Sequence, residues 1–416
     1  MDYSNKSLAD FYSLEGKDIF QTAREFQNYI NWLYQHEYYY PRRISYTGSN
    51  PRMDIHDIYT GEKKEMINFS ANDYLNLVKH PKTIQSGVDA VKKYGTGAGS
   101  VPILAGTLDL HVELEKKLAR FKHCEDSIIY TSGFGSNMGT LLAMLKKDDL
   151  AVIDQYAHAS IADGCIGTTL RTFKHNDMNS LEKIMKINSR MNYKTKIICV
   201  DGVYSMDGDI ANLPEIVTIA RQYNAYVYVD DAHATGVIGE NGKGTAEYYH
   251  MQGQVDIVAG TLSKALGSTG GFIASNKELV NYLRFYSRPY MFSTAMTPQT
   301  AASLMTGLDV IEHEPEIRKR LWNNIYYLKN KLSNLGLDVS RSESAIFPVI
   351  MGSNLKVMQM MKYLHKNNIM VSHVSYPAVP VELSRIRISL MQGHTQEDMD
   401  YLVYHLEKKG KELGII

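Results

Sequence analysis

Short apolar runs alternate with longer stretches of helical spacing through the middle of the chain. The runs occupy residues 127–131, 150–154, 196–201, 225–230, 256–260 and 271–274. Runs in which nearly every position is apolar are typical of strands covered on both faces, which occur in parallel sheets flanked by helices. The pattern therefore predicts an α/β domain with a mostly parallel sheet. The carboxyl ends of such strands line the ligand crevice, so the chemistry is expected there.

The two ends of the chain have different patterns. Aromatic residues crowd positions 29–40, which predicts an amphipathic helix that runs into an extended arm. Beyond about residue 300, helical spacing gives way to short strand-like pieces at 345–351, 369–374 and 385–390, and then to a final helix over 396–411. We therefore predict three parts: an N-terminal helix and arm (1–65), a large domain (66–298) and a C-terminal α+β domain (299–416).

Composition removes several classes of function. The chain has 45 Lys+Arg against 45 Asp+Glu, and this zero net charge argues against a nucleic-acid-binding protein. Its 3 cysteines form no CxxC, so neither a disulfide framework nor a thiolate metal site is expected, and no other metal site is predicted. The sequence has no signal-peptide pattern and no apolar window of about 18 residues. We therefore expect a cytoplasmic protein without a transmembrane segment.

Lys264 is the strongest local feature. It follows the predicted strand 256–260 and lies in the segment Thr-Leu-Ser-Lys-Ala-Leu-Gly, with further glycines behind it. An isolated lysine is most often a solvated surface charge. A lysine at a strand end among small residues suits a different role, because its amine is positioned to form a Schiff base with a carbonyl cofactor.

Asp230 ends the most regular of the apolar runs, and His233 follows three residues later. A capping aspartate and a surface histidine would explain this stretch equally well. The functional interpretation is a carboxylate under a pyridinium nitrogen, which keeps the ring protonated and makes the cofactor an electron sink. His233 would then lie near a phenolic oxygen of the same ring.

A glycine-rich turn over residues 130–139 joins a predicted strand to a helix. Such a turn presents backbone N–H groups and the helix dipole to a phosphate. Its spacing is GxGxxxG, which differs from the dinucleotide fingerprint, but Asp154 lies at a plausible distance for a ribose partner. A nicotinamide-dependent oxidoreductase is therefore an alternative from a different class, although it leaves Lys264 and Asp230 unexplained.

Three further segments carry candidate residues. His158 follows the run 150–154, and an acidic segment over 201–209 follows another run. Arg385 and Arg387 alternate within a predicted strand and so share one face, where a guanidinium suits two-point binding of a carboxylate.

Together these segments resemble the α-oxoamine synthases, a branch of the fold-type I pyridoxal-phosphate (PLP) enzymes. The branch includes serine palmitoyltransferase, 8-amino-7-oxononanoate synthase, 2-amino-3-ketobutyrate CoA ligase and 5-aminolevulinate synthase. The resemblance covers about residues 65 to 400. It implies a large domain with a mostly parallel seven-stranded sheet, PLP as cofactor, and a homodimer with shared active sites. It also implies decarboxylative condensation of an amino acid with an acyl thioester, carried by CoA or acyl carrier protein.

The resemblance also implies roles around the cofactor ring. Lys264 matches the Schiff-base lysine, which also acts as acid and base at the amino acid's Cα. Asp230 matches the partner of the pyridine nitrogen, and His233 the group near the phenolic oxygen. His158 matches the histidine that stacks on the ring, and Ser205 a serine on the ring's oxygen side.

The remaining matches concern phosphate and substrate. Gly133 and Phe134 match the turn that donates to the phosphate, and Thr261 and Ser263 flank that phosphate. Other matched positions are Ser293 and Thr294, which would reach the phosphate of the partner subunit, and Asn72 and Arg387, which would bind the substrate and its carboxylate.

Specificity is the least determined feature. The segments 106–115 and 174–178 look like the lipid-forming synthases, which start sphingolipids from serine or sulfonolipids from cysteate. The segments 73–76 and 99–102 depart from the usual patterns of the family. We expect a serine palmitoyltransferase-like or cysteate acyltransferase-like enzyme, with 8-amino-7-oxononanoate synthase or 2-amino-3-ketobutyrate CoA ligase as the alternative. Lys264 argues against a non-catalytic subunit.

Overall fold

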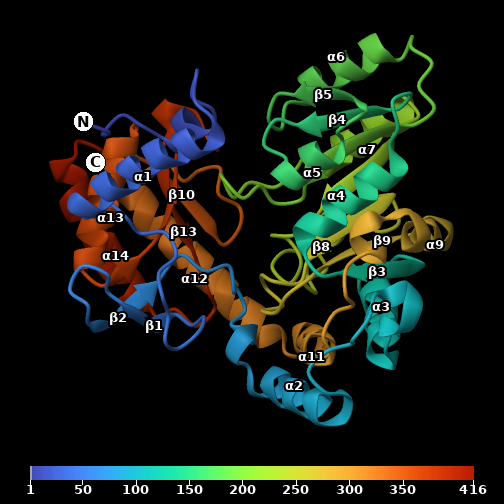
Figure 1. Cartoon of the computed structure of the whole chain (residues 1–416), viewed down its shortest axis with the longest axis horizontal. Helices are drawn as coiled ribbons and strands as arrows, with labels where there is room; N and C mark the ends of the chain where they lie inside the picture. The colour runs from blue at the N-terminus through green and yellow to red at the C-terminus, as the bar shows by residue number, and fades with distance from the viewer. Residues whose placement is uncertain (1) are drawn as a thin grey trace. The chain divides into compact units, whose positions relative to one another are not determined.

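The computed structural model describes residues 2–416. The chain forms two compact units (Figure 1). The larger consists of Asp73–Ser205 and Asp209–Lys319, and the smaller of the residues up to Asn72, Met206–Gly208 and Arg320–Ile416. The domain boundaries predicted after residues 65 and 298 stay a prediction.

A seven-stranded sheet forms the centre of the larger unit. Its strands are β3 (Asp126–Tyr130), β4 (Leu150–Asp154), β5 (Thr169–Phe173), β6 (Lys196–Asp201), β7 (Tyr226–Asp230), β8 (Ile257–Thr261) and β9 (Gly271–Ser275). They lie in the order β3-β9-β8-β7-β6-β4-β5. Only β9 runs antiparallel to its neighbours. The predicted α/β architecture with a mostly parallel sheet is therefore confirmed.

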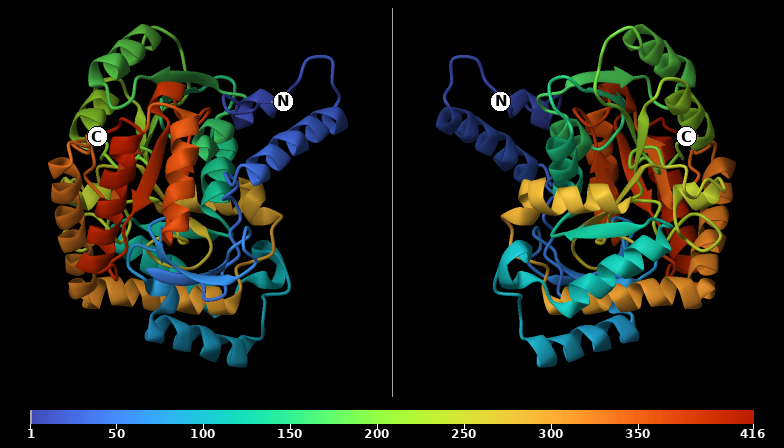
Figure 2. Two further views of the ribbon diagram at one scale, coloured as in Figure 1. Left: turned by 90° about the vertical axis from the view of Figure 1, so that its left-hand side faces the viewer. Right: turned by 90° about the vertical axis from the view of Figure 1, so that its right-hand side faces the viewer.

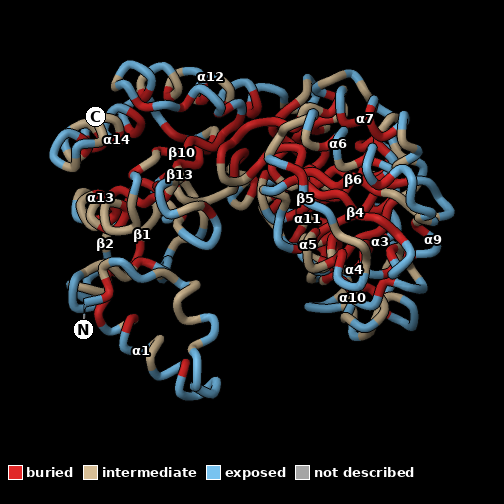
Figure 3. The backbone as a smooth tube through the Cα atoms, turned by 90° about the horizontal axis from the view of Figure 1, so that it is seen from above, coloured by how far each residue is buried: buried red, intermediate tan, exposed pale blue. Residues whose placement is uncertain are grey.

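Helices cover both faces of this sheet, which explains the continuous apolar runs. Side chains from one face pack with α4 (Gly133–Met144), α5 (Ala159–Gly164) and α9 (Lys277–Tyr286). Those from the other face pack with α6 (Met178–Asn188) and α7 (Leu213–Gln222). Within β6, Cys199 belongs to the first cluster and its neighbour Val200 to the second. In Figure 3 the inner strands of this sheet are mostly buried, and β4, β8 and β9 are buried along their whole length.

Strand β5 was not predicted, because it has exposed positions and no continuous apolar run. It pairs only with β4. Its middle positions are exposed, and Arg171 is among them. An edge strand with one open side does not need an apolar run, so the pattern that indicates the inner strands is missing here.

The remaining helices of the larger unit surround the sheet. They are α2 (Pro81–Tyr94), α3 (Asp109–Phe121), α8 (Thr245–Tyr248), α10 (Arg288–Met291) and α11 (Pro298–His313). Helix α11 packs against α2 and α3. The boundary between the units falls inside α12 (Pro315–Asn334).

The smaller unit contains two three-stranded sheets. The first has the order β1 (Arg52–His56), β2 (Lys63–Asn68), β11 (Ile369–Met370), and the second β10 (Ile346–Ile350), β13 (Arg385–Ser389), β12 (Ser372–Val374). The single strand predicted over 369–374 is therefore wrong, since the chain changes sheets at Val371. Helices α13 (Asn354–Lys366) and α14 (Gln396–Glu412) complete this unit together with α1.

Helix α1 (Ile19–Gln35) forms the predicted amphipathic helix and is the long blue helix of Figure 2. Asp18 caps it by accepting a hydrogen bond from the Gln21 N–H at 2.8 Å. Tyr29 and Trp32 pack in an aromatic cluster, and the opposite face of the helix is exposed. Among residues 2–416, no helix has an apolar stretch long enough to span a bilayer.

Candidate functional site

Acidic residues end three neighbouring strands of the large sheet. Asp154, Asp201 and Asp230 are the last residues of β4, β6 and β7, which lie side by side and run parallel. Their carboxylates therefore meet at one edge of the sheet, where a ligand crevice is expected. These are the strand ends at which the sequence predicts the chemistry.

Asp230 is held by two donors. The side chain of Asp230 is buried, and its Oδ2 accepts a hydrogen bond from Asn137 Nδ2 at 2.6 Å. Its Oδ1 accepts a second from the Ala232 N–H at 2.9 Å. Donors of this kind stabilise the ionised carboxylate and fix its orientation. A buried, oriented carboxylate fits a pyridinium nitrogen, because the two opposite charges neutralise each other.

His158 is the N-cap residue of α5. Its backbone N–H donates to Asp201 Oδ1 at 3.1 Å, and its ring meets Phe134 edge-on with centroids 6.2 Å apart. Much of the side chain is accessible to solvent in the ligand-free chain. Even so, burial of the ring nitrogens lowers the pKa of His158, with Asp230 opposing that shift and Lys264 adding to it. His158 is therefore neutral at physiological pH.

Lys264 follows the end of β8 and interacts electrostatically with His158 and Asp201. Its charge lowers the pKa of His158, and it opposes the rise in the pKa of Asp201 that burial and Asp230 produce. These two shifts indicate that Lys264 lies near His158 and Asp201. Its role as the Schiff-base lysine stays a prediction.

His233 lies at the same edge and is buried. Its Nδ1 lies 2.6 Å from the hydroxyl of Tyr74, which is also buried. The sequence did not identify Tyr74 as a site residue, since it is separated from His233 by 159 positions. This bond fixes the ring of His233, and Tyr74 is the residue that orients it.

A candidate phosphate cradle lies at the N-terminus of α4. Ser132 caps this helix by accepting from the Gly135 N–H at 2.9 Å. A Cβ at Gly133 would lie 2.9 Å from Thr261 Oγ1, so only glycine allows this approach. Thr261 Oγ1 lies 2.8 Å from Ser263 Oγ. The first amides of a 12-residue helix and two hydroxyls form the donor set that a phosphate requires.

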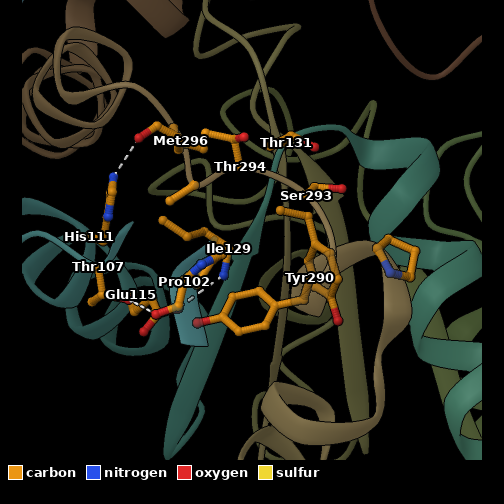
Figure 4. Close-up of a pocket in the computed structure, with 13 residues that line it drawn as sticks. Pro102, Thr107, His111, Glu115, Ile129, Thr131, Tyr290, Ser293, Thr294 and Met296 are labelled. Atoms are coloured by element: carbon orange, nitrogen blue, oxygen red, sulfur yellow. Dashed lines mark hydrogen bonds between the residues drawn. The ribbon is translucent and has the colours of Figure 1, made fainter. Parts of the chain in front are cut away.

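Ser293 and Thr294 lie elsewhere in the larger unit. They line a pocket with His111, Glu115 and Tyr290, which Figure 4 shows. Burial raises the pKa of Glu115 to about 7. Arg284, whose Nη2 lies 3.1 Å from Glu115 Oε2, opposes that shift. Ser205 follows β6 and is half-buried.

Asn72 and Arg387 belong to the smaller unit, where they lie together. Arg387 Nη2 donates to Asn72 Oδ1 at 3.4 Å. Arg385, two positions earlier on the same face of β13, is buried and bonded to the Asp207 carboxylate and to the Met206 carbonyl. The structure therefore distinguishes the two arginines that the sequence left equivalent, because Arg385 already has a carboxylate partner.

A second histidine site was missed by sequence reasoning. His175 Nδ1 lies 2.9 Å from Asp154 Oδ1, and its Nε2 lies 3.0 Å from Asp209 Oδ2. The short segment 174–178 was noted only for its resemblance to the lipid-forming synthases. Its two carboxylate partners lie 21 and 34 positions away from it in the sequence, so no local pattern indicates this site.

Comparison with known proteins identifies the family of enzymes to which the chain is similar. The family model "Aminotransferase class I and II" matches residues 64–406. The 8-amino-7-oxononanoate synthase of Thermoanaerobacter pseudethanolicus is 42% identical over 355 residues, which cover 85% of this chain and 90% of that protein. The serine palmitoyltransferase of S. paucimobilis has a TM-score of 0.90 at 28% identity, with 96% of this chain and 100% of that chain covered.

A third likeness extends over the N-terminal arm. The 4-hydroxy-2,2'-bipyrrole-5-methanol synthase PigH of Serratia sp. is 38% identical over 416 residues. The match covers 99% of this chain and 63% of that longer protein. The N-terminal arm of this chain therefore has a counterpart in a relative, although it lies outside the residues 65 to 400 that carry the resemblance to the α-oxoamine synthases.

Proposed function

The chain belongs to the α-oxoamine synthases within the class I and II aminotransferase family, and on that basis we propose that it condenses alanine with a pimeloyl thioester. The family confirms the predicted fold, the PLP cofactor and the acyltransferase chemistry in which an amino acid and an acyl thioester condense with loss of CO2. The nicotinamide alternative has no support in these likenesses.

The proposed substrates follow from the product after which the relative is named. In 8-amino-7-oxononanoate the amino carbon carries a methyl group, so this part of the molecule comes from alanine without its carboxylate. The remaining carbons, including the free carboxylate and the new ketone, come from the thioester of a linear dicarboxylic acid. The observation that carries this proposal is the 42% identity to an 8-amino-7-oxononanoate synthase over 355 residues.

A lipid-forming condensation is the second candidate. It was the first expectation from the sequence, and it is supported by the TM-score of 0.90 to a serine palmitoyltransferase. That protein is 28% identical to this chain, against 42% for the 8-amino-7-oxononanoate synthase. Because side chains rather than the backbone select the substrate, the higher identity ranks alanine and pimeloyl thioester before serine or cysteate and a long acyl chain.

We propose the predicted roles for the residues around the cofactor ring. PLP, when bound, supplies a conjugated ring that delocalises the electron pair left on Cα as CO2 departs. The Lys264 amine holds the cofactor and then moves the proton at Cα. Asp230 keeps the proton on the ring nitrogen, and neutral His158 packs on the ring face. His233, oriented by Tyr74, donates toward the phenolic oxygen, with Ser205 on the same side.

The phosphate cradle is proposed to hold the cofactor's phosphate. Gly133 and Phe134 contribute N–H donors, and Thr261 and Ser263 contribute hydroxyls. The fit is supported by the glycine at position 133, because a side chain there would collide with Thr261 and separate the helix N-terminus from the Thr261 hydroxyl. Ser293 and Thr294 would complete the phosphate site of a second copy, since the resemblance implies a homodimer.

Large exposed apolar side chains near the pocket that Ser293 and Thr294 line support the dimer. Leu104, Phe285 and Phe292 are 76%, 65% and 71% exposed. Such exposure of aromatic and aliphatic groups on one unit is uncommon for a monomer and is removed when a second copy covers them.

We propose that Arg387 and Asn72 bind the amino acid, with the guanidinium on its carboxylate. The cytoplasm is the proposed location, where three free thiols are compatible with the reducing conditions.

Release of free thiol from a panel of substrates tests the function. The purified protein, saturated with PLP, is mixed in turn with alanine, serine, cysteate and glycine, each with pimeloyl-CoA and palmitoyl-CoA. We expect thiol release that is fastest with alanine and pimeloyl-CoA and absent in Lys264→Ala. A preference for serine or cysteate with palmitoyl-CoA would instead establish the lipid-forming function. No thiol release with any pair would contradict both candidates.

A further inference from the structure

Five buried or crevice side chains beneath the proposed cofactor ring form one connected hydrogen-bond network. Its centre is Asn137 on α4, which is 3% exposed. Around it lie the Tyr228 hydroxyl at 2.7 Å, Asp230 Oδ2 at 2.6 Å and Ser160 Oγ at 2.9 Å. Ser160 in turn reaches His158 Nδ1 at 2.7 Å. One amide thus connects two residues to which the proposed function gives separate roles.

The chemistry of the groups determines the direction of every bond in the network. A carboxylate only accepts, so the atom of Asn137 that faces Asp230 is the amide nitrogen. Its two hydrogens serve Asp230 and Ser160, and its oxygen accepts from the Tyr228 hydroxyl. Tyr228 therefore fixes the amide in the one orientation that gives Asp230 a donor.

The same reasoning determines the direction of the hydrogen bonds at His158. Because Ser160 Oγ already accepts from Asn137, its own hydrogen is available for His158 Nδ1. The Ser160 backbone N–H, which can only donate, also reaches Nδ1 at 3.3 Å. Two donors on Nδ1 leave the proton of the neutral imidazole on Nε2. The network therefore selects one tautomer of the ring that is proposed to stack on the cofactor.

We propose that Asn137 is a positioning residue that sets both the ionised Asp230 under the ring nitrogen and the Nε2–H tautomer of His158 on the ring face. The inference rests on the proposed roles of Asp230 and His158. It predicts that the two roles are coupled, because the same carboxamide supplies a hydrogen to each branch. A residue that merely filled space in the core would affect neither the tautomer nor the ring nitrogen.

Two substitutions separate the branches of the network. Ser160→Ala removes the hydroxyl donor to His158, keeps the weaker backbone N–H donor at 3.3 Å and leaves the bond from Asn137 to Asp230 intact. Asn137→Asp keeps the shape of the side chain but removes both hydrogens and places a carboxylate beside Asp230. Thr140→Val is the matched control, since Thr140 is fully buried on the same helix and lies 3.4 Å from the Tyr130 hydroxyl, outside the network.

The first readout is nitrogen NMR of His158 in the cofactor-free protein, assigned by loss of its signal in His158→Gln. We expect the Nε2–H tautomer in the native chain and in Thr140→Val, and a mixture of tautomers in Ser160→Ala and Asn137→Asp. A native signal typical of Nδ1–H, or a tautomer unchanged in both variants, would overturn the inference. Because this measurement needs no cofactor and no substrate, it is independent of the proposed function.

The second readout is the nitrogen NMR signal of the cofactor ring in the PLP-loaded protein. With labelled cofactor, the nitrogen signal of the pyridine ring is expected to be that of the protonated form in the native chain, Thr140→Val and Ser160→Ala. In Asn137→Asp it should move toward the unprotonated form, and the cofactor should bind about tenfold more weakly or worse. An unchanged ring signal in a folded Asn137→Asp protein would refute the Asp230 branch. Failure of the native protein to condense any substrate would refute the proposed function and leave the tautomer result standing.

Discussion

Protonation of His175 is expected to stabilise the larger unit at neutral pH. Both nitrogens of its ring face carboxylates, Asp154 at 2.9 Å and Asp209 at 3.0 Å, so both donate only when the ring is charged. Burial by itself lowers the pKa of His175, but the two hydrogen bonds outweigh it and raise the pKa to about 9. The side chain is 10% exposed, so solvent screens the two ion pairs little.

The magnitude follows from linkage between proton binding and folding. The pKa of His175 rises from the usual 6.5 to about 9 on folding, which corresponds to about 3 kcal/mol of free energy of unfolding. The folded state binds the proton more tightly, so this contribution is complete below about pH 6.5. It is lost as the pH rises through about 9.

The measurement compares the native chain with His175→Gln, which keeps one donor and cannot be charged. Urea unfolding of the cofactor-free proteins at about pH 6 and about pH 9.5 gives a difference in stability at each pH. We expect the native chain to be more stable by about 3 kcal/mol at the lower pH and by little at the higher. Taking the difference removes the titration of cysteines and tyrosines that both proteins share. Equal differences at the two pH values, or a His175 ring signal that titrates near its usual pH, would refute the reasoning.

Three further predictions test the site and the proposed dimer interface. Asp230→Asn should raise the barrier to condensation by about 2–4 kcal/mol, because the ring nitrogen loses its charged partner, and an unaltered kcat at saturating cofactor would show the assignment is wrong. Arg387→Lys should weaken binding of the amino acid by about tenfold with the cofactor's visible band intact, whereas Arg385→Lys should lower thermal stability; the reverse pattern would move the carboxylate site to Arg385. Phe292→Asp should convert a dimer into monomers in sedimentation, and an unchanged mass would exclude this surface from the interface.

The inner strands and the strand-end residues could be predicted from the sequence because both leave a local signal. A strand covered on two faces needs apolar residues at consecutive positions, as in β6, and the polar residue that interrupts the run marks its end. Asp230 and Lys264 were identified in this way. Strand β5 has one open edge and exposed positions, so its residues carry no such pattern.

The residues that orient the site leave no local signal. Asn137 lies 93 positions from Asp230, and Tyr74 lies 159 positions from His233. Each was part of a segment that the sequence analysis considered, but as a helix turn or a departure from a family pattern. The orienting roles proposed for them depend on a buried hydrogen bond between distant segments, and a linear pattern does not contain the pairing of segments.

The two arginines of β13 show what decides between equivalent residues. A period of two places Arg385 and Arg387 on one face, and nothing in the strand itself ranks them. The ranking comes from Asp207, 178 positions earlier, which pairs with Arg385 in the same unit. A buried arginine without such a partner would be costly, so Asp207 retains Arg385 as a structural cation. Arg387 donates to the neutral amide of Asn72 at 3.4 Å, and binding of the substrate carboxylate remains the role proposed for it.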